Sequence, residues 1–214
     1  MDLTDDRHSR DHDHVLAPRV PVTGDDVDLV ASKVVDALRR GVDQDWLVPA
    51  GKLEWTCWDT SEHVASVGLV YAAQLAIRKQ EHRYARLFPR LFAEPAPVEV
   101  LESIEAAFRL LAMTVRGTGP DVRAYHPRGV ADAEGFAALA CMEALVHCHD
   151  IVSGLGLPFE PSRAVCARVL ARSFPAAVEG GDDPWTALLW ATGRVARPGH
   201  EPVSEWRQRS EPLP

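Results

Sequence analysis

The stretch that determines the fold of this 214-residue chain is "FAALACMEALVHCHDI", residues 136–151. Most of its residues are apolar, which is typical of a helix buried at the centre of a helical protein. Four ionisable side chains interrupt the apolar run: Glu143, His147, His149 and Asp150. A buried carboxylate needs a partner charge or hydrogen-bond donors, because burying it alone is expensive. The stretch therefore predicts a central helix whose polar groups have a specific partner.

The spacing places two of these groups together on the buried face. Steps of four, three, four and three residues mark that face: Phe136, Ala140, Glu143, His147 and Asp150. Glu143 and His147 lie one turn apart on it, whereas His149 points about 200° away from His147. Two interpretations remain open for the pair. It is either a Glu–His hydrogen bond that fixes helix packing, or two ligands of one cation at the i, i+4 spacing that lets HExxH helices hold zinc.

The rest of the chain predicts an all-α protein. Apolar residues at three-to-four spacing, with turn and capping residues between them, predict helices over these ranges: 25–41, 59–82, 97–115, 132–154, 161–174 and 185–195. Asp59 and Glu62 can form a capping box at the start of the second helix. No segment alternates in the way a strand does. The expected architecture is a four-helix bundle with additional C-terminal helices, in a domain over 23–197 between a disordered tail (1–22) and an irregular tail (198–214).

Composition and charge exclude several classes of function. The formal net charge of −8 disfavours nucleic acid or an anionic membrane as the main partner, because both reward a basic surface. No apolar run reaches the roughly 18 residues of a transmembrane helix, and no basic-then-apolar leader is visible, so we expect a cytoplasmic protein. The 4 cysteines form no CxxC pair, which indicates free buried thiols.

A third ligand for the cation is available on another helix. His63, in "WDTSEHVASVG", shares a helical face with Val67 and Val70; a simple core histidine is the competing interpretation. Two imidazoles and one carboxylate would leave coordination positions open, as in catalytic zinc sites. Such a site can bind and deprotonate a thiol at neutral pH. Zn²⁺ is the first choice of metal, and Ni²⁺, Fe²⁺ or Mn²⁺ also suit mixed nitrogen and oxygen ligands.

Three segments resemble a known family: "WTCWDTSEHV" (55–64), "YHPRGVADAEGFAALACMEALVHCHDI" (125–151) and "LLWATGR" (188–194). They are similar to the DinB-like metal-dependent bundles, in the actinobacterial branch typified by mycothiol-dependent maleylpyruvate isomerase. The resemblance implies a DinB-like four-helix bundle with His63, Glu143 and His147 as the metal triad. It also implies a low-molecular-weight thiol, such as mycothiol or bacillithiol, as cosubstrate. The expected reaction is addition or transfer of this thiol to a small electrophile, as a transferase or isomerase.

Four further residues are candidates for supporting roles. Asp150 is expected to orient a metal ligand, or else to brace a neighbouring helix. His126, a second candidate catalytic residue, and Tyr125 lie in the loop before the metal helix and could reach the mouth of the bundle; an ordinary loop role is the alternative. Arg194 could pair with a carboxylate of the thiol or substrate, or form a surface salt bridge.

Other functions remain open at this point. The same ligands could activate water in a hydrolase. A non-catalytic metal- or ligand-binding bundle would have the same triad, whereas a metal-free sensor domain would leave His63 far from the Glu143–His147 pair. Trp55 and Trp58 are expected to pack the end of the bundle. The expected partners are a small electrophile and a small thiol, without nucleic acid or membrane, in a monomer or homodimer.

Overall fold

The computed structural model describes residues 19–81, 83–84, 96–181 and 183–213, so most of the predicted N-terminal tail lies outside the described residues. Within these ranges the chain forms helices and no strand, with only two isolated β-bridges, which confirms the all-α class. The α-helices are α1 (Gly24–Leu38), α2 (Cys57–Ile77), α3 (Pro97–Arg116), α4 (Ala133–Leu155), α5 (Arg163–Ser173) and α6 (Pro184–Ala191). Two 3₁₀ helices accompany them: η1 (Arg39–Gly41) and η2 (Pro175–Gly180).

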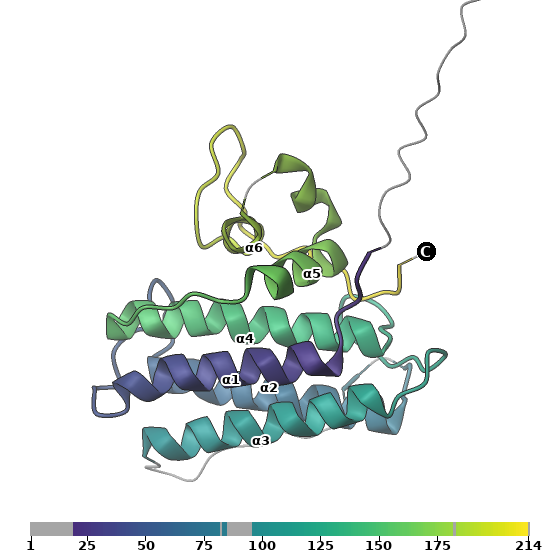
Figure 1. Cartoon of the computed structure of the whole chain (residues 1–214), viewed down its shortest axis with the longest axis horizontal. Coiled ribbons are helices and arrows are strands. Elements are labelled where there is room, and N and C mark those ends of the chain that lie inside the picture. Colours follow the sequence, from purple (N-terminus) through teal and green to yellow (C-terminus); the bar gives the residue numbers. More distant parts are fainter. Residues whose placement is uncertain (1–18, 82, 85–95, 182, 214) are drawn as a thin grey trace, which may run out of the picture.

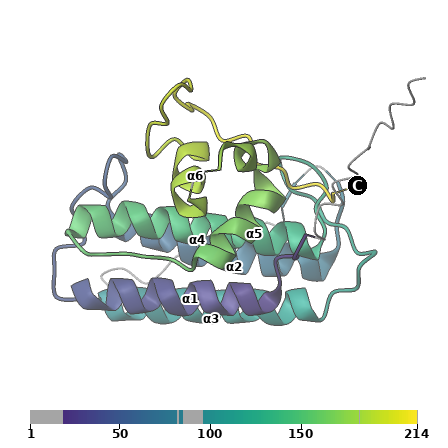
Figure 2. The same cartoon turned by 45° about the horizontal axis from the view of Figure 1, so that its top comes forward.

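The four long helices, α1 to α4, lie side by side and form the main body of the molecule (Figures 1 and 2). Both α1 and α2 pack against α3 and α4. The shorter helices α5 and α6 pack against each other on the α4 side of this body, and α5 contacts α4 directly. Helix α4 is therefore covered on several sides at once.

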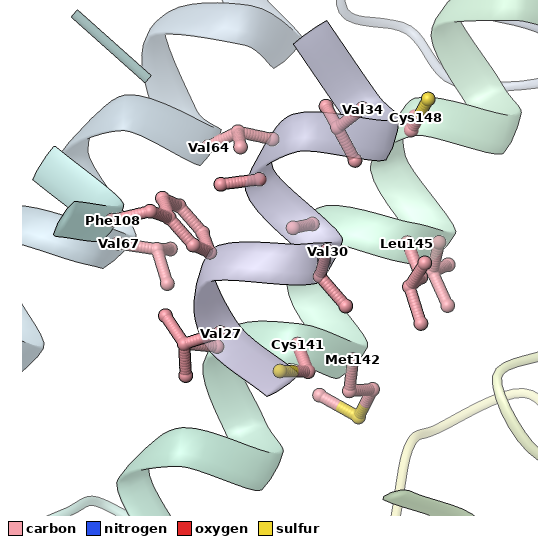
Figure 3. Close-up of a cluster of buried hydrophobic side chains, with 14 of the residues drawn as sticks. Val27, Val30, Val34, Val64, Val67, Phe108, Cys141, Met142, Leu145 and Cys148 are labelled. Atoms are coloured by element: carbon pink, nitrogen blue, oxygen red, sulfur yellow. The ribbon is translucent and has the colours of Figure 1, made fainter. Parts of the chain in front are cut away.

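The core between these helices is built from aliphatic side chains at helical spacing. Val27, Val30 and Val34 of α1 lie among residues of the other three long helices, including Phe108 of α3 and Leu145 of α4 (Figure 3). By length and composition α4 would suit a membrane span, yet 89% of its most apolar window is buried inside the protein. The predicted core helix is therefore the most enclosed element of the fold.

The start of α2 differs from the prediction. Its N-cap is Thr56 rather than Asp59, because the Thr56 hydroxyl accepts from the Asp59 N–H while the Asp59 carboxylate accepts from the Thr56 N–H. The Cys57 N–H also donates to the Val48 carbonyl at 2.9 Å, so the preceding loop fixes this position. The far end is shorter than predicted, since Arg78 takes a left-handed conformation (φ 54°) and ends the helix at Ile77.

Both ends of the described chain pack against the start of α4. On the N-terminal side, Arg19 pairs with the Glu134 carboxylate, which also accepts the Val22 N–H at 3.0 Å. On the C-terminal side, the fully buried Arg172 donates to the carboxylate of Asp132 at 3.0 Å and to the carbonyl of Ser210 at 2.9 Å. Residues 203–211, which we call the C-terminal strap, are thus irregular in backbone but fixed in place.

Replacing Arg172 with Met is expected to lower the free energy of unfolding by about 2–4 kcal/mol, because the Asp132 carboxylate and the Ser210 carbonyl lose a buried donor. Urea unfolding followed by circular dichroism at pH 7 measures this change. Arg163→Met is the matched control, since the Arg163 side chain is 76% exposed and lies 3.6 Å from Asp183. That exposed pair should contribute less than about 1 kcal/mol, so equal losses in the two variants would contradict the buried role of Arg172.

Candidate metal centre

Helices α2 and α4 bring the three predicted ligands together. The His63 Nε2 atom lies 3.4 Å from the Glu143 Oε2 atom, and the His147 Nε2 atom lies 3.1 Å from the same oxygen. One donor atom from each side chain lies within 4.8 Å of the others, so this group could hold a metal ion. The interpretation that leaves His63 far from the Glu143–His147 pair is therefore wrong.

The backbone around the triad explains this convergence. Glu143 and His147 are one turn apart on α4, and His63 lies early in α2, whose start is fixed by its capping box. The loop before α2 rests on the end of α4, where Gly154 meets the Pro49 carbonyl so closely that a Cβ atom would clash. An isolated bridge between Pro49 and Thr56 closes this loop. The loop and the two helices thus fix the triad from both sides.

The Glu143 carboxylate is ionised within this group. Burial by itself raises the pKa of Glu143, but hydrogen bonds and charge interactions with His147 and His63 outweigh it and lower the pKa to about 2. Its side chain is only 13% exposed. The centre therefore presents a negative oxygen between two imidazoles, which is the donor set that a divalent cation takes.

Asp150 and Arg194 fix the orientation of His147. The Asp150 Oδ2 atom lies 3.2 Å from His147 Nδ1, and Arg194 donates to the two Asp150 oxygens at 3.2 and 2.7 Å. Burial raises the pKa of Asp150, but hydrogen bonds from His147 and Arg194 outweigh it and lower that pKa. Because an ionised carboxylate only accepts, Nδ1 donates a proton to Asp150, and Nε2 likewise donates one to Glu143 in the metal-free protein. Burial lowers the pKa of His147, but the hydrogen bonds to these two carboxylates outweigh it and raise that pKa. Loss of the Nε2 proton would leave a lone pair that faces the triad.

Asp150 therefore touches the triad through His147 and braces the turn after α6 through Arg194, so its contacts fit both of the roles expected for it. The Arg194 guanidinium is paired within the chain: it holds Asp150, donates to the Thr192 carbonyl at 2.7 Å and lies 4.5 Å from the centre of the Trp206 ring. Its side chain is 12% exposed, so this is a buried pair rather than a surface salt bridge.

His126 and Tyr125 belong to a second polar cluster. Its central residue, Tyr71, lies eight positions after His63, about 12 Å along α2. The Arg128 N–H donates to His126 Nδ1 at 3.1 Å, so the proton of the neutral imidazole is on Nε2, which lies 3.3 Å from the Tyr71 hydroxyl. Burial lowers the pKa of His126 to about 4. The Tyr125 ring lies edge-on to Tyr84, at 5.8 Å between centroids.

Two tryptophans beside the triad were not among the predicted site residues. Trp55 is 47% exposed, and its ring centroid lies 5.2 Å from that of His63 and 6.5 Å from that of His147. Trp206, from the C-terminal strap, lies 5.9 Å from His147. Trp55 was expected to pack the bundle end rather than to stack on a substrate, and Trp206 falls in a segment predicted to be irregular. An aromatic residue within a polar, proline-rich segment was the available signal for Trp206.

The cysteines supply no reactive thiolate. All 4 are free and buried, as predicted: Cys57, Cys141, Cys148 and Cys166. Burial raises the pKa of Cys57 to about 11 and that of Cys166 to about 12, and it raises the pKa values of Cys141 and Cys148 well above the usual range. At neutral pH these thiols stay protonated and act as small apolar side chains.

Comparison with known proteins finds no match to a family model, to a curated protein or to a solved structure. Inference about function therefore starts from the side chains of the centre itself. They offer two imidazole nitrogens and one ionised carboxylate oxygen as donors. Asp150, Arg194 and Trp206 surround His147 and form an outer layer of contacts.

The buried neutral His126 predicts a pH dependence of stability. Its folded pKa of about 4 lies below its unfolded value of 6.5, so the unfolded chain binds more protons between these values and stability falls as the pH falls from 6.5 to 4. Replacing His126 with Phe should make the decrease in the free energy of unfolding over this pH range smaller by up to about 3 kcal/mol. Urea unfolding of both proteins at pH 7, 5.5 and 4, without added metal, measures the difference. Parallel pH profiles for the two proteins would contradict the prediction.

Proposed function

We propose that this chain is a divalent-metal-dependent enzyme that uses a low-molecular-weight thiol, with His63, Glu143 and His147 as the metal ligands. The reaction is addition or transfer of the thiol to a small electrophile. The observation that carries the proposal is the convergence of two imidazole nitrogens and one ionised carboxylate oxygen within 4.8 Å, from two different helices.

The donor set fits such an ion. Ligand atoms about 2.1 Å from a tetrahedral zinc ion lie about 3.4 Å apart, and the two imidazole-to-carboxylate distances here are 3.4 and 3.1 Å. Three protein ligands leave a position for an exogenous ligand, as in catalytic sites. The mixed nitrogen and oxygen set also suits Ni²⁺, Fe²⁺ or Mn²⁺. When bound, the ion would lower the pKa of a coordinated thiol so that the thiolate persists at neutral pH.

The chain's own residues would support this chemistry in distinct ways. Asp150 holds the His147 Nδ1–H, so the Nε2 lone pair faces the ligand position. Trp55 presents a half-exposed ring beside His63, where it can contact an apolar part of a ligand. None of the 4 cysteines lies in an environment that favours a thiolate, so the sulfur nucleophile would come from a separate molecule.

The resemblance of residues 55–64, 125–151 and 188–194 supports the assignment of the chain to the DinB-like bundles. A histidine on the second long helix and Glu-x-x-x-His on the fourth follow the order of ligands in that family. Mycothiol or bacillithiol is the cosubstrate that this assignment implies, in the cytoplasm. We also infer that the protein works as a monomer or homodimer, and that its partners are small molecules rather than nucleic acid or a membrane.

Metal content tests the ligand set. Protein purified without chelator and without an affinity tag, then dialysed with a slight excess of Zn²⁺, should retain about one ion per chain by mass spectrometry. His147→Ala and Glu143→Gln should each lower retention at least about tenfold, because each removes a ligand. His149→Ala is the matched control on the same helix, since that imidazole lies against Trp185 at 5.8 Å.

This assignment of ligands fails in either of two cases. The wild-type protein could take up none of Zn²⁺, Ni²⁺, Fe²⁺ and Mn²⁺, in which case Glu143 and His147 form only a structural pair. Alternatively, His149→Ala could lose as much metal as His147→Ala, which would place the ion elsewhere.

The requirement for thiol tests the reaction. The metal-loaded protein should form thioether products from epoxides, activated alkenes or alkyl halides only when mycothiol, bacillithiol or another small thiol is added. In each case the thiolate sulfur bonds to the electrophilic carbon while a C–O bond of the epoxide, the π bond of the alkene or the C–halogen bond breaks. The epoxide oxygen or the adjacent alkene carbon takes the electron pair and then the proton released by the thiol, whereas the halogen leaves as halide and that proton passes to solvent. Chromatography with mass detection measures the product, and His147→Ala should reduce its rate at least about 100-fold. Turnover that proceeds equally without thiol would indicate a hydrolase and overturn the thiol-dependent reaction.

A further inference from the structure

Four side chains around His147 form a closed ring of contacts. His147 Nδ1 lies 3.2 Å from Asp150, and Asp150 holds Arg194 at 2.7 Å. The Arg194 guanidinium lies 4.5 Å from the centre of the Trp206 ring, in a cation–π contact. The Trp206 ring in turn lies 5.9 Å from the His147 ring, with an angle of 33° between the two planes. This circle of four contacts thus begins and ends at His147, which is one of the proposed metal ligands.

The position of Trp206 is set by contacts on either side of it in the strap. Before it, the Val203 carbonyl lies so close to Gly193 (φ +74°) that a Cβ atom there would be 2.5 Å away. After it, the Arg209 N–H donates to the Ser173 carbonyl at 2.8 Å, and the Ser210 carbonyl accepts from buried Arg172. The indole is therefore presented to Arg194 by a segment that is fixed to α5 and to the turn after α6.

Trp206 contacts a charged and a titratable group of the site as well as the apolar core. Its ring lies against the Arg194 guanidinium and the His147 imidazole, and it also packs against the apolar core, so it joins the strap to both the core and the site. The Arg194 and Asp150 side chains are 12% and 6% exposed, and the indole face covers the guanidinium. Removing the indole would admit water to this ion pair and weaken it, because charge interactions fall as the local dielectric constant rises.

We propose that Trp206 is a positioning residue of the metal centre: it keeps Arg194 on Asp150, which fixes His147 for metal binding. Docking of the C-terminal strap and binding of the ion therefore stabilise each other, since each favours the same arrangement of His147. This inference rests on the proposed metal site. It adds residues 203–211 to the functional part of the chain.

A double-mutant cycle on Zn²⁺ affinity tests the proposal. Trp206→Ala and Arg194→Met should each weaken Zn²⁺ binding by about 10–100-fold, the range for residues that orient a metal ligand. Because both act through Asp150, the double variant should bind no more than about twofold more weakly than Arg194→Met alone. Trp206→Phe, which keeps an aromatic face, should recover most of the affinity. Competition with a chromophoric chelator gives the dissociation constants.

Trp185→Ala is the control, since Trp185 contacts His149 and Phe159 rather than this ring of residues. It should leave Zn²⁺ affinity within about twofold of wild type, and circular dichroism should show that every variant is folded. Trp206→Ala protein that binds Zn²⁺ as tightly as wild type would overturn the proposal. So would fully additive effects of the two single changes.

A metal-free measurement separates this proposal from the proposed function. In the protein without metal, the Arg194 Nε–H should give a slowly exchanging NMR signal that is lost in Trp206→Ala, because the indole shields the ion pair. If that signal is lost but wild type binds no metal, the metal site falls while the link from Trp206 to Asp150 stands. If metal binds and the signal is unchanged in Trp206→Ala, the positioning role falls alone.

Discussion

The Glu143 carboxylate lies in α4, the most apolar of the four long helices, and its charge has to be balanced there. Two imidazoles, from α2 and from one turn further along α4, lie within hydrogen-bond range and keep it ionised despite its burial. Balancing that charge requires α2 and α4 to pack so that His63 lies beside Glu143. The capping box of α2, the loop before it and the close approach at Gly154 all serve that register.

A second layer of charge surrounds the first. Asp150 orients His147, Arg194 balances Asp150, and the C-terminal strap places Trp206 against Arg194. These contacts lead from the buried face of α4 to the C-terminal strap, which has no regular secondary structure. In a purely structural ion pair this layering would be unnecessary, because the Glu143–His147 contact already satisfies the carboxylate. Under the metal-binding role that we propose, the outer layer would set the position of a ligand and so affect affinity.

Helical periodicity made most of the fold and the Glu143–His147 pair predictable from the sequence, whereas the choice of His63 as third ligand also depended on the family resemblance. Apolar spacing identified the long helices, and i, i+4 spacing placed Glu143 and His147 on one buried face. The start of α2 was misplaced because Thr56–Asp59 and Asp59–Glu62 both match a capping box, and only the backbone bond to Val48 selects the first. The role of Trp206 could not be predicted, because the strap has no period and its position depends on distant anchors such as Arg172 and Gly193. The pairing of Arg194 with Asp150 likewise depends on the turn after α6.

The most direct test of the central claim is anomalous X-ray diffraction at the zinc absorption edge, from crystals of tag-free protein grown with one equivalent of Zn²⁺. We expect one strong peak about 2.0–2.2 Å from His63 Nε2, His147 Nε2 and a Glu143 oxygen. Peaks confined to the surface, with the two imidazoles still bonded only to Glu143, would contradict it. The centre would then be a buried ion-pair cluster that holds α2 against α4.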